Sequence, residues 1–257
     1  MYEITKFLPR EIFDDLLTIL PIPKQKRYGR KRCEFEAILN GVLQVLVNGV
    51  SWNKVAFCGC SYGTCYRYFR EMQRRGKLKL IFEALAGKKT NMAEAAIDTS
   101  SASSFRFRRM TGWDGKHKKI KTKISLLTDK KGLPVDVAFG KGSTRDLTFV
   151  PAHVQKQARK HKMGILNLDK GYTSCELRRK LRNHGTYVNM KTRDGDYIRK
   201  IGPKFGFKED KYKVRFLVEK VFAWVENFRR IKLRREYKPA MFKAFVYLAL
   251  ILILLRN

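Results

Sequence analysis

The segment KIKTKISLLTDKKGLPVDVAF, residues 119–139, carries the pattern that decides the fold. Its first half alternates polar and apolar side chains and then becomes continuously apolar, which is typical of a partly buried strand. Residues 130–132, Lys-Lys-Gly, have the composition of a tight turn, and residues 133–139 alternate again. Two such runs around a turn predict a β-hairpin in the middle of the chain.

Shorter apolar runs before and after this hairpin are typical of further strands. Residues 95–97 form one run that ends in Asp98, and residues 164–168 form another that is followed by Asp169. The remaining segments predict a helix, a second helix, a short strand and a last helix over 146–162, 174–183, 187–190 and 212–230. This order predicts a mixed α/β domain over residues 91–257.

Residues 1–90 are expected to form a small all-α domain. Prolines stop a helix over 8–20, and a helical apolar stripe over 33–48 ends at a glycine. Residues 51–71 then predict a short helix, a turn and a second helix capped by Ser61, which is the outline of a helix-turn-helix. The second helix carries side chains suited to DNA phosphates and base edges: Arg67, Arg70 and Arg74. An ordinary helical hairpin with a basic solvated face is the alternative.

The charge of the chain indicates its partners. Lys and Arg number 56 against 23 Asp and Glu, a formal net charge of +33 spread along all 257 residues. Nucleic acid is the first partner expected for such a chain and an anionic membrane surface the second. The apolar run 244–255 has twelve residues, fewer than the ~20 that span a bilayer, so we expect a packed helix and a soluble, cytoplasmic protein.

The five cysteines, at positions 33, 58, 60, 65 and 175, are odd in number and irregular in spacing. This pattern argues against a disulfide framework. Cys58, Cys60 and Cys65 lie close in sequence, but C-x2-C pairs are absent and no His follows at ligand spacing. We therefore expect free or buried thiols.

Acidic residues suggest a site at one edge of the predicted sheet. Asp98 and Asp169 each follow a strand, and the carboxyl ends of neighbouring strands meet at one edge. In the last helix, Tyr212, Arg215 and Glu219 share one side at the border of the apolar stripe. Turn residues and a solvated row of charge are the structural alternatives.

Three converging carboxylates repel one another unless cations lie between them. Oxygen ligands without His or Cys suit Mg²⁺ or Mn²⁺, and two such ions about 4 Å apart can hold a phosphodiester. A basic protein with this trio is expected to be a nuclease or another phosphoryl-transfer enzyme that acts on DNA or RNA.

The acidic motifs resemble those of a known family. Residues 97–100, Ile-Asp-Thr-Ser, resemble its first motif, and residues 168–174, LDKGYTS, its second. Tyr212-x2-Arg215-x3-Glu219 matches the first three members of the signature Y-x2-R-x3-E-x6-K. On these residues the chain resembles the DDE transposases of bacterial and archaeal insertion sequences, in the groups numbered four and five. Residues 28–31, 49–52 and 64–69 are similar to the N-terminal domain of this family.

The resemblance implies an RNase H-like fold and assigns roles to these residues. Asp98, Asp169 and Glu219 would be the catalytic and metal-binding triad for Mg²⁺ or Mn²⁺, with two ions expected. Tyr212 and Arg215 would grip DNA beside the cleavage point, with Arg215 on a phosphate. Lys170 would neutralise phosphate charge next to Asp169.

Two positions depart from the family pattern. The signature Lys is replaced by Glu226, which would repel a phosphate. Either Arg229 or Arg230 takes its place, or this copy is impaired. In addition, Ser125 stands where many relatives have His after Lys-Ile, so a secondary polar contact is expected to be missing.

The expected function is an insertion-sequence transposase that binds terminal inverted repeats, cuts by attack of water and joins 3′ ends to target DNA. We expect a homodimer associated with the nucleoid, double-stranded DNA as the partner, and neither a membrane nor a small-molecule substrate. The alternatives are a catalytically impaired or repurposed DNA-binding protein derived from a transposase, a structure-selective nuclease on the same fold, and a peripheral membrane protein.

Overall fold

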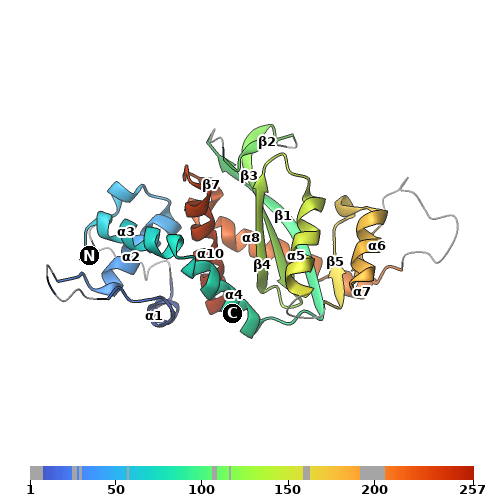
Figure 1. The fold of residues 1–257 in the computed structure, drawn as a ribbon, viewed down its shortest axis with the longest axis horizontal. Helices are drawn as coiled ribbons and strands as arrows, with labels where there is room; N and C mark the ends of the chain where they lie inside the picture. The colour runs from blue at the N-terminus through green and yellow to red at the C-terminus, as the bar shows by residue number, and fades with distance from the viewer. Residues whose placement is uncertain are drawn as a thin grey trace. The chain divides into compact units, whose positions relative to one another are not determined.

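The chain folds into two compact units, seen in a computed structural model (Figure 1). The structure describes residues 8–24, 28, 31–56, 58–105, 109–115, 117–158, 163–191 and 206–257. Unit 1 comprises Met1–Leu85, Ala102–Arg109 and Trp224–Asn257, and unit 2 comprises Ala86–Ser101 and Met110–Ala223. These units are defined by contacts between residues and combine several segments of the chain. They do not test the expected domain boundary between residues 90 and 91, which stays a prediction.

A mixed sheet lies mainly in unit 2, while its segments Ala102–Ser104 and Leu233–Arg234 belong to unit 1. Its strands are β1 (Glu94–Ser104), β2 (Gly112–Asp114), β3 (Lys119–Asp129), β4 (Pro134–Lys141), β5 (Ile165–Asn167), β6 (Tyr187–Asn189) and β7 (Leu233–Arg234). The order is β2-β3-β1-β5-β6, with β4 paired to β3 and β7 paired to β1. β5 runs parallel to β1 and to β6, whereas β3 is antiparallel to β2 and β4.

The β3–β4 hairpin confirms the pattern of residues 119–139. Gly132 adopts a left-handed φ of 80°, which glycine accepts without a Cβ clash. The carboxylate of Asp129 accepts hydrogen bonds from the backbone N–H groups of Lys131 (2.9 Å), Leu133 (2.8 Å) and Asn91 (3.1 Å). These bonds fix the turn and tie it to the segment that enters β1.

Helices flank this sheet, and with the mixed strand order they confirm the expected RNase H-like fold. They are η3 (Asp146–Thr148), α5 (Phe149–Ala158), η4 (Lys170–Tyr172), α6 (Cys175–Asn183), α7 (Glu209–Tyr212) and α8 (Arg215–Glu226), the last of which ends within unit 1. α5 packs on β4 and α6 on β6 (Figure 1). The core between them is apolar and includes Ile97, Leu127, Val150, Leu166 and Leu181.

Two predicted elements have different limits in the structure. The first strand does not end at Asp98 but continues to Ser104, as a neighbour of β3 in the sheet and with its last two residues paired to β7. The predicted helix over 212–230 consists of α7, α8 and the start of α9 (Arg229–Lys232). Between α7 and α8 the backbone forms tight turns in place of α-helical hydrogen bonds. The N–H of Phe216 donates to Lys213 O and the N–H of Leu217 donates to Val214 O, both at 3.1 Å. Most of the predicted loop over 191–211 lies outside the described residues.

Unit 1 is mainly helical and confirms the expected N-terminal helices. It contains α1 (Arg10–Ile19), α2 (Phe35–Asn48), η2 (Trp52–Lys54), α3 (Tyr62–Arg74), most of α4 (Lys77–Lys89), α9 and α10 (Pro239–Arg256). α2 ends at Gly49, whose left-handed φ of 68° lets its N–H bond to Val45 O at 3.1 Å.

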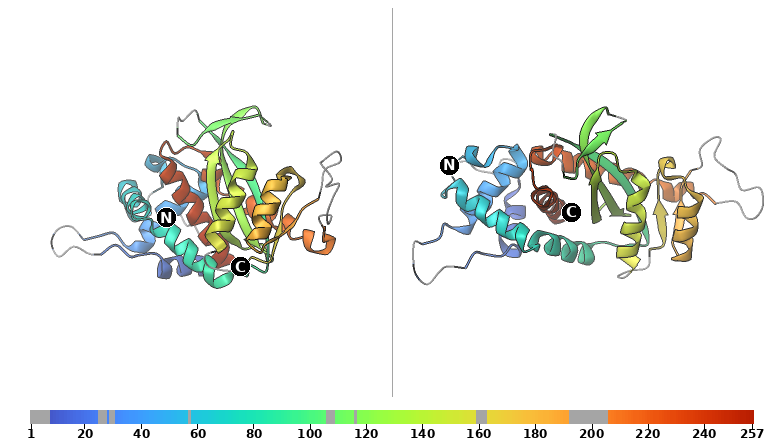
Figure 2. Two further views of the ribbon diagram at one scale, coloured as in Figure 1. Left: turned by 45° about the vertical axis from the view of Figure 1, so that its right-hand side comes forward. Right: turned by 45° about the horizontal axis from the view of Figure 1, so that its top comes forward.

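The terminal helix α10 forms the core of this unit. By length and composition it is the one helix among the described residues that is apolar enough to cross a membrane, but 67% of its apolar window is buried in the protein. It packs against α1 and α3 (Figure 2), and Phe245 stacks on Phe69 at 4.3 Å between ring centroids. This burial confirms the predicted packed helix, since a helix that is apolar on all sides has to be enclosed.

Candidate active site

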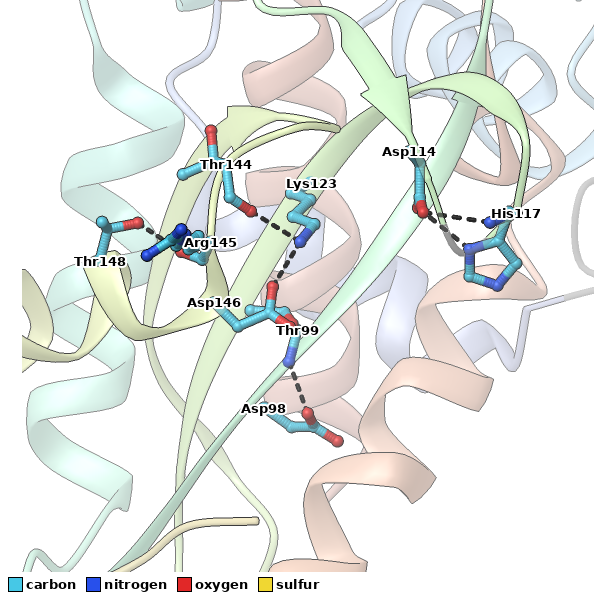
Figure 3. Close-up of polar contacts among 9 residues, drawn as sticks. All are labelled: Asp98, Thr99, Asp114, His117, Lys123, Thr144, Arg145, Asp146 and Thr148. Atoms are coloured by element: carbon cyan, nitrogen blue, oxygen red, sulfur yellow. Dashed lines mark hydrogen bonds and ion pairs between the residues drawn. The ribbon is translucent and has the colours of Figure 1, made fainter. Parts of the chain in front are cut away.

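Strand register places Asp98 and Asp169 side by side. β1 and β5 are parallel and pair Ala96 with Asn167, and each aspartate lies two residues beyond its paired residue. Asp98 is half-buried within β1 and accepts the backbone N–H of Thr99 at 2.8 Å (Figure 3). Asp169 follows β5, is half-buried and accepts the N–H of Gly171 at 3.4 Å as the cap of η4. Two carboxylates thus lie at the same level of adjacent strands.

The charges of Glu219 and Arg215 act on the carboxylate of Asp98, so these two residues of α8 lie near it. Burial raises the pKa of Asp98 to about 6, and the negative charges of Glu219 and Asp169 add to this rise. The Thr99 N–H and the positive charge of Arg215 oppose it. The structure therefore brings together the three predicted acids and the predicted arginine in unit 2.

α8 holds Glu219 and Arg215 in a defined relation. Arg215 Nη1 and Glu219 Oε1 are 3.0 Å apart, one helical turn along, with side chains 15% and 52% exposed. The Arg215 guanidinium also packs over the rings of Phe216, at 4.7 Å from the centroid, and Tyr212, at 5.7 Å. The apolar stripe of α8, which borders this polar side, is anchored in the core by Val218, Val221, Phe222 and Val225. Arg215 is thus more enclosed than an exposed phosphate contact would be, and its role in DNA binding stays a prediction.

Tyr212 is buried beside these groups. Burial raises the pKa of its hydroxyl, Arg215 lowers it, and the charges of Asp169 and Asp98 raise it further. Tyr212 belongs to α7, whereas Arg215 and Glu219 belong to α8. The Arg215 guanidinium still packs on the Tyr212 ring, so the three residues lie together as predicted.

Two nearby residues were not predicted as site residues. Tyr172 is buried, which raises the pKa of its hydroxyl, and the charges of Asp98, Asp146 and Asp169 raise it further. Asp146 Oδ1 pairs with Lys123 Nζ at 2.6 Å, and Lys123 also donates to Thr144 O at 2.7 Å (Figure 3). Tyr172 lies in the LDKGYTS motif, so the sequence could have indicated it as a site residue. Asp146 stands in no such motif, and only the fold brings it to this site.

The predicted DNA contacts around α8 and α9 differ in exposure. Lys170 and Arg229 are exposed, as is Glu226. Arg230 is buried, pairs with Glu236 and donates to Val50 O at 3.1 Å. Of the two arginines considered as replacements for the signature Lys, only Arg229 is accessible to a DNA phosphate.

The arginines of α3 lie on its exposed side. Arg67, Arg70 and Arg74 are exposed, although Arg74 pairs with Glu71 at 3.1 Å. Ser61 caps the helix by accepting the N–H of Thr64 at 3.4 Å, as predicted. The helix expected over 51–56 is only the three-residue η2, so the helix-turn-helix outline is shorter than the sequence suggests.

Ser125, which stands where many relatives have His, takes part in a buried polar network. His153 Nε2 lies 3.0 Å from its hydroxyl, and His153 Nδ1 lies 2.7 Å from Asp136 Oδ2. Burial raises the pKa of Asp136, but His153 and Lys156 outweigh it and hold that pKa below its usual value. Although Ser, His and Asp form a chain as in some hydrolases, all three side chains are buried, so no substrate reaches the serine and the network is structural.

Comparison with known proteins identifies the family. A family model described as transposase DDE domain matches residues 93–255, and a second, described as putative transposase of IS4/5 family, matches residues 8–82. The chain belongs to the transposase DDE domain family. No curated protein matches it by sequence.

Solved structures of transposases resemble this member of the family only distantly. The piggyBac transposase synaptic complex with hairpin DNA, seen by cryo-EM, is 13% identical over 79% of this chain, with a TM-score of 0.41. The Mos1 transposase paired-end complex with left transposon end is 12% identical over 86% of this chain and 82% of its own, with a TM-score of 0.26. The chain spans about half (50%) of the piggyBac chain. These TM-scores are too low to support an argument about the fold. The assignment of an RNase H-like fold is therefore based on the strand order and the flanking helices of this chain.

The acidic residues fit the divalent cation on which DDE transposases in general depend. Asp98, Asp169 and Glu219 offer hard oxygen ligands from β1, the end of β5 and α8, which is the donor type that Mg²⁺ and Mn²⁺ prefer. Their mutual repulsion contributes to the raised pKa of Asp98. A cation among them would remove that repulsion.

Proposed function

We propose that the protein is an insertion-sequence transposase that binds terminal inverted repeats and catalyses metal-dependent DNA strand cleavage and strand transfer. The observation that carries this proposal is the convergence of Asp98, Asp169 and Glu219 in a chain of the transposase DDE domain family. Carboxylates that meet on an RNase H-like sheet in a protein of charge +33 are suited to a reaction on a DNA phosphodiester.

In this proposal the three acids hold two ions, Mg²⁺ or Mn²⁺. The bound ions would activate the attacking water or 3′ hydroxyl and stabilise the leaving oxygen. Arg215 keeps Glu219 oriented through its ion pair and offsets part of the negative charge around Asp98. Lys170, which is exposed next to Asp169, contacts a phosphate of the bound strand.

DNA recognition is proposed for residues 1–90, with residues 91–257 as the catalytic domain. The exposed arginines of α3 would contact the terminal repeats: Arg67, Arg70 and Arg74. Tyr212, Arg215 and Arg229 would contact the strand to be cut. Two transposon ends have to be joined in one reaction, so we propose a homodimer on double-stranded DNA, both repeat and target, in the nucleoid of the cytoplasm.

The proposal predicts that Asp169→Ala abolishes cleavage without loss of DNA binding. With a labelled element end, the parent protein should nick and join DNA in Mg²⁺ or Mn²⁺ but not in EDTA. Loss of a ligand that acts in the transition state should lower the rate by at least ~10³-fold. Binding by gel shift should stay within about twofold, because the variant removes no phosphate contact.

Asp15→Ala, which changes an exposed aspartate of α1, is the matched control and should cut at the parent rate. If Asp169→Ala cuts as fast as the parent, the assignment of the acids is wrong. Nicking without any joining of 3′ ends would instead favour a nuclease.

A second candidate function rests on Glu226. This exposed residue stands on α8 where the family signature has Lys, and it would repel a DNA phosphate. A parent protein that binds repeats but shows no cleavage that depends on Asp169 would be a repurposed DNA-binding protein.

A further inference from the structure

Three cysteines of unit 1 bring their sulfur atoms together. The Sγ atoms of Cys58, Cys60 and Cys65 all lie within 4.8 Å of one another, and the Cys60 and Cys65 sulfurs are 3.3 Å apart. All three side chains are buried, with exposed fractions of 4%, 5% and 0%. The sequence contains only five cysteines, so most of them meet at one point of a single unit.

Local backbone geometry builds this cluster. Gly59 adopts a φ of 93°, a conformation that side-chain-bearing residues rarely accept, and so turns the chain between Cys58 and Cys60. Ser61 then caps α3, whose first turns carry Cys65. Both ends of the short motif therefore have fixed directions, one set by the glycine turn and the other by the helix.

α2 leaves space for the sulfurs at Gly41. A Cβ at this position would clash with Cys65 Sγ and would lie 3.3 Å from Cys58 Sγ. Glycine inside a helix is less favourable than alanine, so a glycine here needs a packing reason. The reason is the cluster, because any side chain at residue 41 would occupy the place of the thiols.

We propose that Cys58, Cys60 and Cys65 bind one zinc ion. Thiolates are the preferred ligands of structural zinc, with Zn–S bonds of about 2.3 Å, and three sulfurs within 4.8 Å of one another can share one ion. Apolar side chains could fill the same space, but they would give no reason for three sulfurs to meet. The ion would tie the segment 58–60 to the first turns of α3, which packs on α2.

The sequence did not predict this site because the ligands do not form C-x2-C pairs. Cys58 and Cys60 are separated by one residue and Cys65 follows five residues later. The turn at Gly59 and the start of α3 bring these sulfurs together, and Gly41 of α2 leaves space for them.

Metal content tests the proposal. The full-length protein, purified from cells grown with added zinc, should contain about one zinc ion per chain by elemental analysis. Cys58→Ser and Cys65→Ser should each lower this content at least about fivefold. Cys175→Ser is the matched control, since Cys175 is exposed and belongs to unit 2, and it should keep the zinc.

A second measurement covers variants that fold poorly. After chelation of the parent protein, added Co²⁺ should give the intense visible absorption of a tetrahedral thiolate site, and added Zn²⁺ should remove it. Parent protein that is folded but holds less than about a tenth of an ion per chain, or that shows no such spectrum, overturns the proposal. So does a Cys60–Cys65 disulfide in protein purified under reducing conditions, or zinc that survives both Cys58→Ser and Cys65→Ser. None of these results bears on cleavage, so the zinc site and the transposase proposal stand or fall separately.

Discussion

At the residue scale, the charged carboxylate of Asp98 lowers the free energy of unfolding when no cation is bound. Its carboxylate is half-buried within a strand, next to two other acids, and Arg215 and one backbone N–H are its opposing partners. The result is a pKa of about 6 against about 3.9 in an unfolded chain. Active sites commonly reduce stability in this way.

This shift predicts a dependence of stability on pH. Between about pH 4 and pH 6 the folded state keeps the proton of Asp98 and the unfolded state does not, so the metal-free protein loses stability as the pH rises through this window and then levels off. Asn does not titrate. Asp98→Asn should therefore raise the free energy of unfolding by about 1–2 kcal/mol at pH 7.5 and by much less at pH 4.

Urea unfolding in EDTA at both pH values measures the difference between the variant and the parent. Asp15→Asn, at an exposed position of α1, serves as the control and should change stability little at either pH. An Asp98→Asn effect that is equal at pH 4 and pH 7.5 would show that the raised pKa is not the cause.

At the element scale, α8 carries both the acid of the site and the departure from the family pattern. Glu219 and Glu226 are seven residues apart, two turns of one helix, and so lie on the same side of it. The core-facing side of the helix is fixed by Val218, Val221 and Val225. A strand of DNA that passes along Glu219 and its cation would therefore meet a negative charge at Glu226.

Glu226→Lys should strengthen binding of the element end and raise the cleavage rate. The change replaces repulsion of a phosphate by attraction, which we expect to lower Kd about three- to tenfold at low salt and to steepen its salt dependence by about one unit of slope. Fluorescence anisotropy and single-turnover cleavage measure the two effects. Glu176→Lys, the same charge change at an exposed position of α6, is the control. A cleavage rate that stays equal or falls in Glu226→Lys would count against an impaired copy.

At the scale of the whole molecule, the charge of +33 dominates association with DNA. Acids number 23 against 56 basic residues, so a large excess of positive charge is not balanced within the chain. Self-repulsion of such a chain is relieved by a polyanion, and release of counterions from DNA makes binding depend steeply on salt.

Binding to an inverted repeat should therefore weaken by about 10³-fold or more between 50 mM and 200 mM salt. Arg67→Ala or Arg70→Ala should each reduce the slope of log K against log salt by about one, because each removes one exposed cation of α3. Arg10→Ala is the control, since Arg10 already pairs with Asp14 at 2.9 Å and Glu36 at 2.7 Å. A slope near zero for the parent would exclude the proposed contact with phosphates.

The sequence by itself determined the features that depend on neighbours along the chain. Alternation over residues 119–139 gave the hairpin, and uninterrupted apolarity over 244–255 indicated a buried helix. The acids of the candidate site were also found, because each stands in a short motif. Such signals are local, so periodicity and composition are enough to detect them.

Only the tertiary structure decided what depends on segments far apart in the sequence. Pairing within the sheet, with β3 and finally with β7, carries β1 beyond Asp98, and the register with β5 sets Asp169 beside it. Packing buries Arg230 while Arg229 stays exposed, and it places Cys65 against Gly41. These contacts depend on how strands pair and how helices pack. The spacing of residues within one element predicts neither strand pairing nor helix packing.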